Sequence, residues 1–160
     1  MIRIRAANAG DEPFVAALVP RFVEHGTPDG HAPETVIEGT ARVLRDALLA
    51  PNDGDVFLIA ESDAGEALGF VFAFTVRDFF TGEPLLHISE IAVARSGEGA
   101  GAALLDAVEA RGRARGDAIV SLNVHEDNVA AQRLYRGRGY GVGHVHYVKP
   151  LRRAERDAAV

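Results

Sequence analysis

The sequence of 160 residues contains no cysteine and no tryptophan, and Lys149 is its only lysine. The lack of cysteine excludes a disulfide scaffold, a thiolate metal site and a cysteine nucleophile. No run of about 18 apolar residues is present, so we expect no membrane-spanning helix and no membrane partner. The first residues also lack the apolar core of a secretory signal. We therefore expect a cytoplasmic protein.

The composition is that of an ordinary globular domain, with 48% hydrophobic and 25% charged residues. The net charge of −6 is unevenly distributed. Residues 1–80 hold 6 basic and 13 acidic side chains, a balance of −7, and residues 81–160 hold 11 and 10, a balance of +1. A protein that binds nucleic acid broadly would be more basic, so no nucleic-acid partner is expected. The asymmetry favours an anionic ligand on the second half.

Hydrophobic periodicity and turn residues predict the order of helices and strands. Strands are expected at 2–6, 56–61, 68–76, 85–93, 118–124 and 142–148. Helices are expected from an N-cap at Asp11 to a break at Pro20, and at 34–50, 99–115 and 128–136, with Val36, Ile37, Val43, Leu44 and Leu48 facing inward on the second. This order predicts one α/β domain over residues 1–151, in which a mixed sheet has helices on both faces. A charged tail follows at 152–160.

A glycine-rich turn separates the strand at 85–93 from the helix at 99–115. Gly97, Gly99 and Gly101 occupy alternate positions there, and glycine allows positive φ and a close approach to a ligand. The unpaired N–H groups of the first helical turn then suit a phosphate. A tight turn without a ligand is the alternative, but it would not require three glycines.

Two ligand classes compete for this turn. Gly97-x-Gly99-x-x-Ala102 satisfies a dinucleotide fingerprint, but a nucleotide-dependent oxidoreductase needs more β-α-β units than follow it. Gly99-Ala100-Gly101, followed by an apolar helix, resembles instead the Q/R-x-x-G-x-G/A motif of the GNAT acetyltransferase superfamily, with Ser96 at the Q/R position. The stretch from Asn128 to Tyr140 resembles the same family's N-x-x-A-x-x-L-Y-x-x-x-G-[FY] motif.

The resemblance implies a single GNAT-like domain whose central twisted sheet is mixed and mostly antiparallel. It also implies a pair of parallel strands, at 85–93 and 118–124, that splay apart. Acetyl-CoA is the implied acyl donor, held in that opening, and no metal is implied. The residues expected to contact it are Ile91, Ala92, Val93, Gly97, Glu98, Gly99, Ala100, Gly101, Ala102, Asn128, Ala131 and Tyr135.

The reaction implied by the resemblance is direct acetyl transfer to an amine. Because an ammonium group is not a nucleophile, a base must remove a proton. Glu90 is the expected base, with a relay through water from Glu90 or His87 as an alternative. Tyr135 is expected to protonate the leaving thiolate. Strict strand alternation would place Ile88, Glu90 and Ala92 on one face of the sheet, and Ser89, Ile91 and Val93 on the other.

The acceptor stays open among a small amine, a polyamine, a lysine side chain and a protein N-terminus. Phe79, Phe80 and His87 are the candidate acceptor residues, because aromatic rings attract a cationic amine. Two histidines, His144 and His146, lack the third ligand that zinc needs. Dimers are common in the family. A non-catalytic acyl-CoA-binding module of the same fold remains an alternative, since Ser96 and Glu98 depart from the motif.

Overall fold

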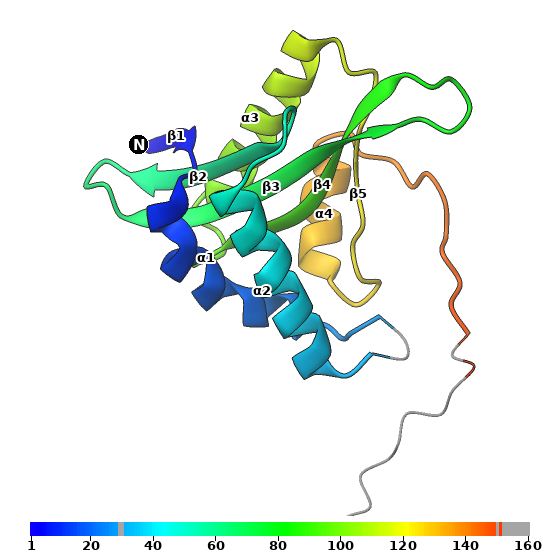
Figure 1. Ribbon diagram of the computed structural model, residues 1–160, viewed down its shortest axis with the longest axis horizontal. Helices are drawn as coiled ribbons and strands as arrows, with labels where there is room; N and C mark the ends of the chain where they lie inside the picture. The colour runs from blue at the N-terminus through cyan, green and yellow to red at the C-terminus, as the bar shows by residue number, and fades with distance from the viewer. Residues whose placement is uncertain (29–30, 150, 152–160) are drawn as a thin grey trace, which may run out of the picture.

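The computed structural model describes residues 1–28, 31–149 and 151. Its five strands form one sheet in the order β1-β2-β3-β4-β5, in which only the β4–β5 pair is parallel (Figure 1). The strands are β1 (Ile2–Ala6), β2 (Val56–Ser62), β3 (Ala67–Arg77), β4 (Pro84–Val93) and β5 (Val120–Leu122). The predicted mixed, mostly antiparallel sheet with one parallel pair is confirmed.

Helices cover both faces of this sheet (Figure 1). They are α1 (Glu12–Leu18), α2 (Pro33–Leu49), α3 (Ala100–Arg115) and α4 (Val129–Gly137), with short 3₁₀ helices η1 (Ala9–Asp11) and η2 (Val19–Val23) around α1. One hydrophobic cluster joins α1, η2 and α2 to the sheet, and a second joins α3 and α4 to the other face. None of the helices in the described ranges is long and apolar enough to cross a membrane.

Local sequence signals explain where the first helix begins and ends. Asp11 occupies the N-cap position of α1, as predicted, but its carboxylate accepts the Asn8 N–H at 2.9 Å and pairs with Arg5 instead of capping the helix. Pro20 lacks an N–H and cannot continue an α-helix. The chain accordingly changes to 3₁₀ geometry at Val19, which places Arg21 and Phe22 beside the end of β4.

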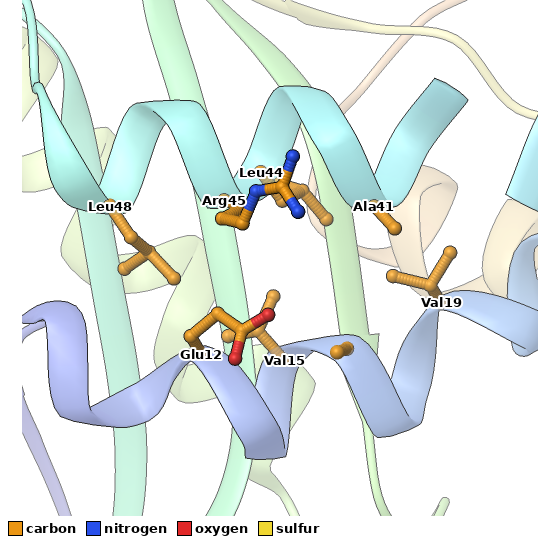
Figure 2. Close-up of a pocket in the computed structure, with 8 residues that line it drawn as sticks. Glu12, Val15, Val19, Ala41, Leu44, Arg45 and Leu48 are labelled. Atoms are coloured by element: carbon orange, nitrogen blue, oxygen red, sulfur yellow. The ribbon is translucent and has the colours of Figure 1, made fainter. Parts of the chain in front are cut away.

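The seam between α1 and α2 is packed by side chains and leaves no open cleft (Figure 2). Val15, Leu44 and Leu48 are each at most 8% exposed there. Val43 was predicted to face inward with them, but its side chain is 49% exposed. The 3.6-residue period explains the difference, because Val43 lies one position off the stripe that Leu44, Ala47 and Leu48 form.

The second half of the chain departs from the predicted strands in two places. β5 covers only residues 120–122 of the expected 118–124, and no strand forms at 142–148. A strand needs a hydrogen-bonded neighbour, and residues 142–148 have none within the described ranges, so the predicted last strand is wrong. The predicted charged tail, 152–160, lies outside the described residues.

Candidate functional site

The candidate site lies where the two parallel strands part. β4 and β5 pair only through Leu86–Val120, His87–Ser121 and Ile88–Leu122, and beyond Ile88 the strand β4 continues without β5 beside it. The β3–β4 register shifts at the same point, because Phe72 faces Glu90 while Ala73 faces Ile88. Ser89 is therefore the extra residue of a β-bulge, and bulges bend a strand and end its pairing.

The bulge changes which side chains share a face of the sheet. Ile88 lies with Ile91 and Val93 on the α3–α4 side. Ala92 packs on the α1–α2 side, where Glu90 also belongs because it pairs with Phe72 of that cluster. The alternation expected from the sequence, with Ile88 on the side of Glu90, is wrong, because the extra residue at Ser89 reverses it.

The backbone of β4 past the bulge offers polar groups to the opening. The N–H of Ala94 donates to Leu68 O of β3 at 2.8 Å. Because hydrogen-bonded and non-hydrogen-bonded positions alternate in an antiparallel pair, Ala92 also bonds to β3 while Ile91 and Val93 face away. The backbone N–H and C=O groups of Ile91 and Val93 therefore lie on the edge of β4 that faces away from β3. Those of Ala92 are directed to β3.

Glu90 is a half-buried carboxylate close to the point of parting. Desolvation raises its pKa to about 7 from an ordinary 4.5, with no contribution from a neighbouring charge. A carboxylate with a pKa near neutrality can both take and release a proton at physiological pH. This property agrees with the role of base expected for Glu90.

His87 lies on the same face of β4 as Glu90 and next to β5. Its Nδ1 is 2.8 Å from Ser121 Oγ, and its ring stacks edge-on against Phe74 at 5.5 Å. Burial lowers its pKa, which keeps the imidazole neutral near pH 7. A neutral imidazole can both accept and donate a proton, which is the property that the expected relay would require.

The glycine turn forms an amide cradle at the start of α3. Gly97 and Gly99 have φ values of +86° and +85°, and Gly99 is the N-cap of α3 with no side chain capping the helix. The first intrahelical bond of this turn is donated by Ala103 to Gly99 O at 3.0 Å. The N–H groups of Ala100, Gly101 and Ala102 precede that bond and are free for an anion.

The acidic residue inside this turn, Glu98, is paired with an arginine. Arg95 Nη1 lies 3.6 Å from Glu98 Oε1, and Arg95 Nη2 lies 3.5 Å from Glu66. Glu98 therefore carries a partner for its negative charge, and the amide cradle keeps its polarity. Ser96, at the Q/R position of the motif, is exposed and contributes only its backbone and a hydroxyl.

Asn128 and Ala131 act together at the start of α4. Asn128 is the N-cap, and its side-chain oxygen accepts the N–H of Ala131 at 3.1 Å. Ala131 packs at the edge of the α3–α4 cluster. The amide oxygen of Asn128 is thus used by the helix, and its NH₂ group is left to donate to a ligand.

Tyr135 projects from α4 into the α3–α4 cluster and is 9% exposed. Its ring lies 5.8 Å from that of Tyr140, whose hydroxyl donates to Glu109 Oε1 at 3.2 Å. The Tyr135 hydroxyl itself donates to no residue in the described part of the chain. Burial raises the pKa of Tyr135, so the hydroxyl stays protonated and available as an acid.

The structure does not bring Phe79 and Phe80 to this site. Both are about nine-tenths exposed at the tip of the β3–β4 hairpin, stacked edge-on on each other at 5.3 Å. The tip projects from the first residues of β4 (Figure 1), and the strand from Pro84 to Glu90 spans about 20 Å at about 3.3 Å per residue. Their expected acceptor role therefore has no support from proximity.

One further residue, Arg21, reaches the site although its sequence context did not single it out. Arg21 of η2 donates from Nη1 to the carbonyl oxygens of Val93 and, at 3.2 Å, of Ala94. A Cβ on Gly26 would lie 2.8 Å from His125 Nε2, so the loop after η2 touches the loop before α4. In the sequence, Arg21 stands out only as the single arginine or lysine between Arg5 and Arg42.

Comparison with known families bears on this geometry. Residues 21–140 match the sequence model of the Acetyltransferase (GNAT) family. No curated protein sequence matches the chain.

Solved structures share the fold over almost the whole chain. A putative acetyl transferase from Pyrococcus furiosus is 25% identical, with a TM-score of 0.73 over 94% of this chain and 100% of the other. A ribosomal-protein-alanine N-acetyltransferase from Brucella melitensis biovar Abortus is 18% identical, with a TM-score of 0.69 over 94% and 99%. An aminoglycoside N-acetyltransferase in complex with CoA is 19% identical, with a TM-score of 0.67 over 94% and 95%.

Proposed function

The chain belongs to the GNAT acetyltransferase family, and on that premise we propose that it transfers the acetyl group of acetyl-CoA directly to a primary amine within a ternary complex. The observation that carries the proposal is the parting of β4 from β5 at the Ser89 bulge. One stretch of chain, from Glu90 to Ala102, carries three chemically distinct groups that support the proposal: the free edge of β4, the amide cradle of α3 and a carboxylate with a pKa of about 7.

The groups around the opening fit acetyl-CoA as cosubstrate. The N–H and C=O groups of Ile91 and the N–H of Val93, which face away from β3, suit the amides of a pantetheine arm lying as an extra strand. The N–H groups of Ala100 to Ala102 suit the pyrophosphate, aided by the dipole of α3. Arg21, beside Val93 O, adds a positive charge near the path of this anionic ligand.

The proton transfers fall on opposite sides of the sheet. Glu90, on the α1–α2 side, takes a proton from the acceptor ammonium, directly or through His87 and water. The amine nitrogen then attacks the thioester carbonyl, the N–C bond forms, the C–S bond breaks, and the nitrogen releases its second proton to water to give the neutral amide. Tyr135, on the α3–α4 side, gives its proton to the departing thiolate, and the backbone N–H of Ile91 is placed to hold the oxyanion.

The acceptor is an amine on a small molecule or a peptide. The structural neighbours include enzymes named for ribosomal-protein alanine and for aminoglycosides. The balance of −7 over residues 1–80, which includes the loop after η2 at the rim of the opening, favours an acceptor that is cationic.

Ligand binding and turnover test the proposal in sequence. Thermal shift with acetyl-CoA, CoA and NADH should show stabilisation by the two CoA species only. A thiol-release assay against amines, polyamines and peptide N-termini should then show turnover. Stabilisation by NADH alone would contradict the proposal, and binding of CoA without turnover on any amine would favour a non-catalytic acyl-CoA-binding module.

The amide cradle predicts a selective loss of affinity in Gly99→Ala. Gly99 and Gly82 both have positive φ, and a Cβ would meet only Ile2 Cδ1 at 3.6 Å at Gly99 and nothing within 4 Å at Gly82, so alanine at either position should cost about 1–2 kcal/mol of stability. Only Gly99 lies at the start of α3, so only Gly99→Ala should weaken CoA binding, by about tenfold or 1.4 kcal/mol. Isothermal titration of both variants checks this, and equal affinities would argue against the cradle.

The acid role predicts that Tyr135→Phe lowers kcat by about 10²-fold while the KM for acetyl-CoA changes little. The ring is kept, so the α3–α4 cluster should retain its packing and the variant its melting temperature. Tyr147→Phe removes a hydroxyl from a side chain that is 90% exposed and serves as the matched control. Unchanged kcat in Tyr135→Phe would remove this residue from the reaction.

A further inference from the structure

A row of aromatic rings crosses the α1–α2 face of the sheet and ends at the candidate site. This aromatic row consists of Phe57 of β2, Phe72 and Phe74 of β3, and His87 of β4. From Phe57 to His87, the centroids of neighbouring rings lie 5.1, 6.1 and 5.5 Å apart. Aromatic pairs in contact have such distances, so the row is one continuous surface across three strands.

The helices cover the aromatic row only in part. Phe72 is 5% exposed and belongs to the core cluster of α1 and α2, whereas Phe74 and His87 are half-buried. The rings at the β4 end of the row therefore keep a surface that the folded chain leaves accessible. Small-molecule sites are typically lined by aromatic side chains around a few polar groups.

Glu90 borders the aromatic row. It lies opposite Phe72 in the β3–β4 pair, and His87 lies opposite Phe74 on the same face of the sheet. Side chains paired in this way have Cβ atoms about 4.5–5.5 Å apart. The carboxylate of the expected base and the outer rings of the row therefore form one patch.

The charge of this patch is confined to one carboxylate. Phe72 opposite Glu90 and Ala92 beyond it on the same face are uncharged, and His87 is neutral near pH 7 because burial lowers its pKa. Glu24, in the loop at the rim of the opening, is already paired with an arginine of η2 at 3.5 Å. One ammonium group thus finds a carboxylate here, whereas a second one would lie against rings without a counter-charge.

We propose that the acceptor is a monoamine whose ammonium group is joined by a short chain to an aromatic ring. This inference rests on the proposed function and names its acceptor class. The ammonium group donates its proton to Glu90, and the ring packs against Phe74 and His87. A free arylalkylamine and an N-terminal phenylalanine both have this chemistry, whereas a polyamine or an aminoglycoside carries several ammonium groups.

Long-range attraction and contact act on different parts of such an acceptor. The balance of −7 over residues 1–80 attracts any cationic amine from solution. The surface that the acceptor touches beside Glu90 is aromatic, so affinity there depends on the apolar area that the acceptor buries. The ring of the acceptor therefore decides which cation is bound.

Steady-state thiol release with matched amines tests the proposal. 2-Phenylethylamine and propylamine each have a single ammonium group and differ in the ring, whereas spermidine has several ammonium groups and no ring. We expect kcat/KM for 2-phenylethylamine to exceed that for propylamine by about 10- to 100-fold, and that for spermidine to be the lowest. A peptide with an N-terminal phenylalanine, compared with 2-phenylethylamine, shows which of the two sources of this chemistry is preferred.

Phe74→Leu removes a ring from the patch and keeps an apolar side chain. It should raise the KM for 2-phenylethylamine at least about threefold, and leave the KM for propylamine and the affinity for CoA unchanged. Phe79→Leu is the matched control, because Phe79 is 92% exposed at the hairpin tip and its replacement should change none of these values. Melting temperatures of both variants verify that the fold is kept.

The failure of this inference can be told from that of the proposed function. A kcat/KM for spermidine above that for 2-phenylethylamine would overturn the inference and leave acetyl transfer in place, as would an unchanged KM for 2-phenylethylamine in Phe74→Leu. If no amine is acetylated, the proposed function fails, and calorimetry with the CoA complex then tests the patch alone. Tighter binding of 2-phenylethylamine than of propylamine supports the patch, and equal binding overturns it.

Discussion

Replacing Glu90 by glutamine is expected to lower kcat by about 10²- to 10⁴-fold, the range of a general base. Glutamine keeps the shape of the side chain but cannot accept the proton of an ammonium group. Because burial raises the pKa of Glu90 to about 7, the wild-type rate should rise with pH through about 7 and level off above it. The glutamine variant should lack this limb in a thiol-release pH profile.

Glu83→Gln is the matched control for this experiment. Glu83 is exposed in the hairpin before β4, and its replacement should leave both the rate and the profile unchanged. If Glu90→Gln keeps the limb near pH 7, another group titrates there, and the relay through His87 becomes the next candidate. A variant with unchanged kcat would remove Glu90 from the chemistry.

The same pKa shift predicts that the folding stability of the wild type falls as pH rises, whereas its rate increases. The folded pKa of Glu90 lies above its ordinary value of 4.5, so the folded state disfavours the charged form. The wild type should therefore be most stable relative to Glu90→Gln below about pH 4.5, and lose ground as pH rises to about 7. Denaturation at pH 5 and pH 8 should show the glutamine variant gaining stability over the wild type at the higher pH, which separates a loss of rate from a loss of fold.

The sequence was informative where local rules decide the outcome. The glycines at 97 and 99 require a positive φ that the turn indeed adopts, and Asn128 caps α4 at the motif's first position. The two motifs therefore located the glycine turn and α4 correctly. These features depend on neighbours within a few residues, which a single sequence displays directly.

The sequence was misleading where pairing between distant segments decides the outcome. Nothing near Ser89 signals the bulge that turns Glu90 to the α1–α2 side, because the register is set by β3. Residues 142–148 have the pattern of a strand, but a strand also needs a hydrogen-bonded neighbour, and none pairs with them in the described ranges. Arg21 reaches Val93 only through the 3₁₀ turn of η2, a tertiary contact that no spacing encodes.

The packing of the α1–α2 layer gives the second large effect, a loss of about 3–5 kcal/mol in Phe70→Ala. Phe70 is fully buried in β3, with the ring of Phe22 edge-on at 6.2 Å and that of Phe57 at 5.8 Å. Removing it deletes a large apolar surface and leaves a cavity that two stiff strands cannot collapse. Typical domains have only about 5–15 kcal/mol of stability, so the midpoint of unfolding should move to a clearly lower urea concentration in the variant.

Phe79→Ala is the matched control, since the same substitution at a side chain 92% exposed should change stability by less than about 0.5 kcal/mol.

Phe22 follows Arg21 in η2, so loss of its partner Phe70 should also loosen the contact of Arg21 with β4 and weaken CoA binding under folded conditions. Urea titrations with equal m-values, followed by calorimetry with CoA, measure both effects. If Phe70→Ala lowered the free energy of unfolding only slightly, this cluster would not be what holds α1 and α2 to the sheet. The position of the β4 edge would then not depend on the packing of that layer.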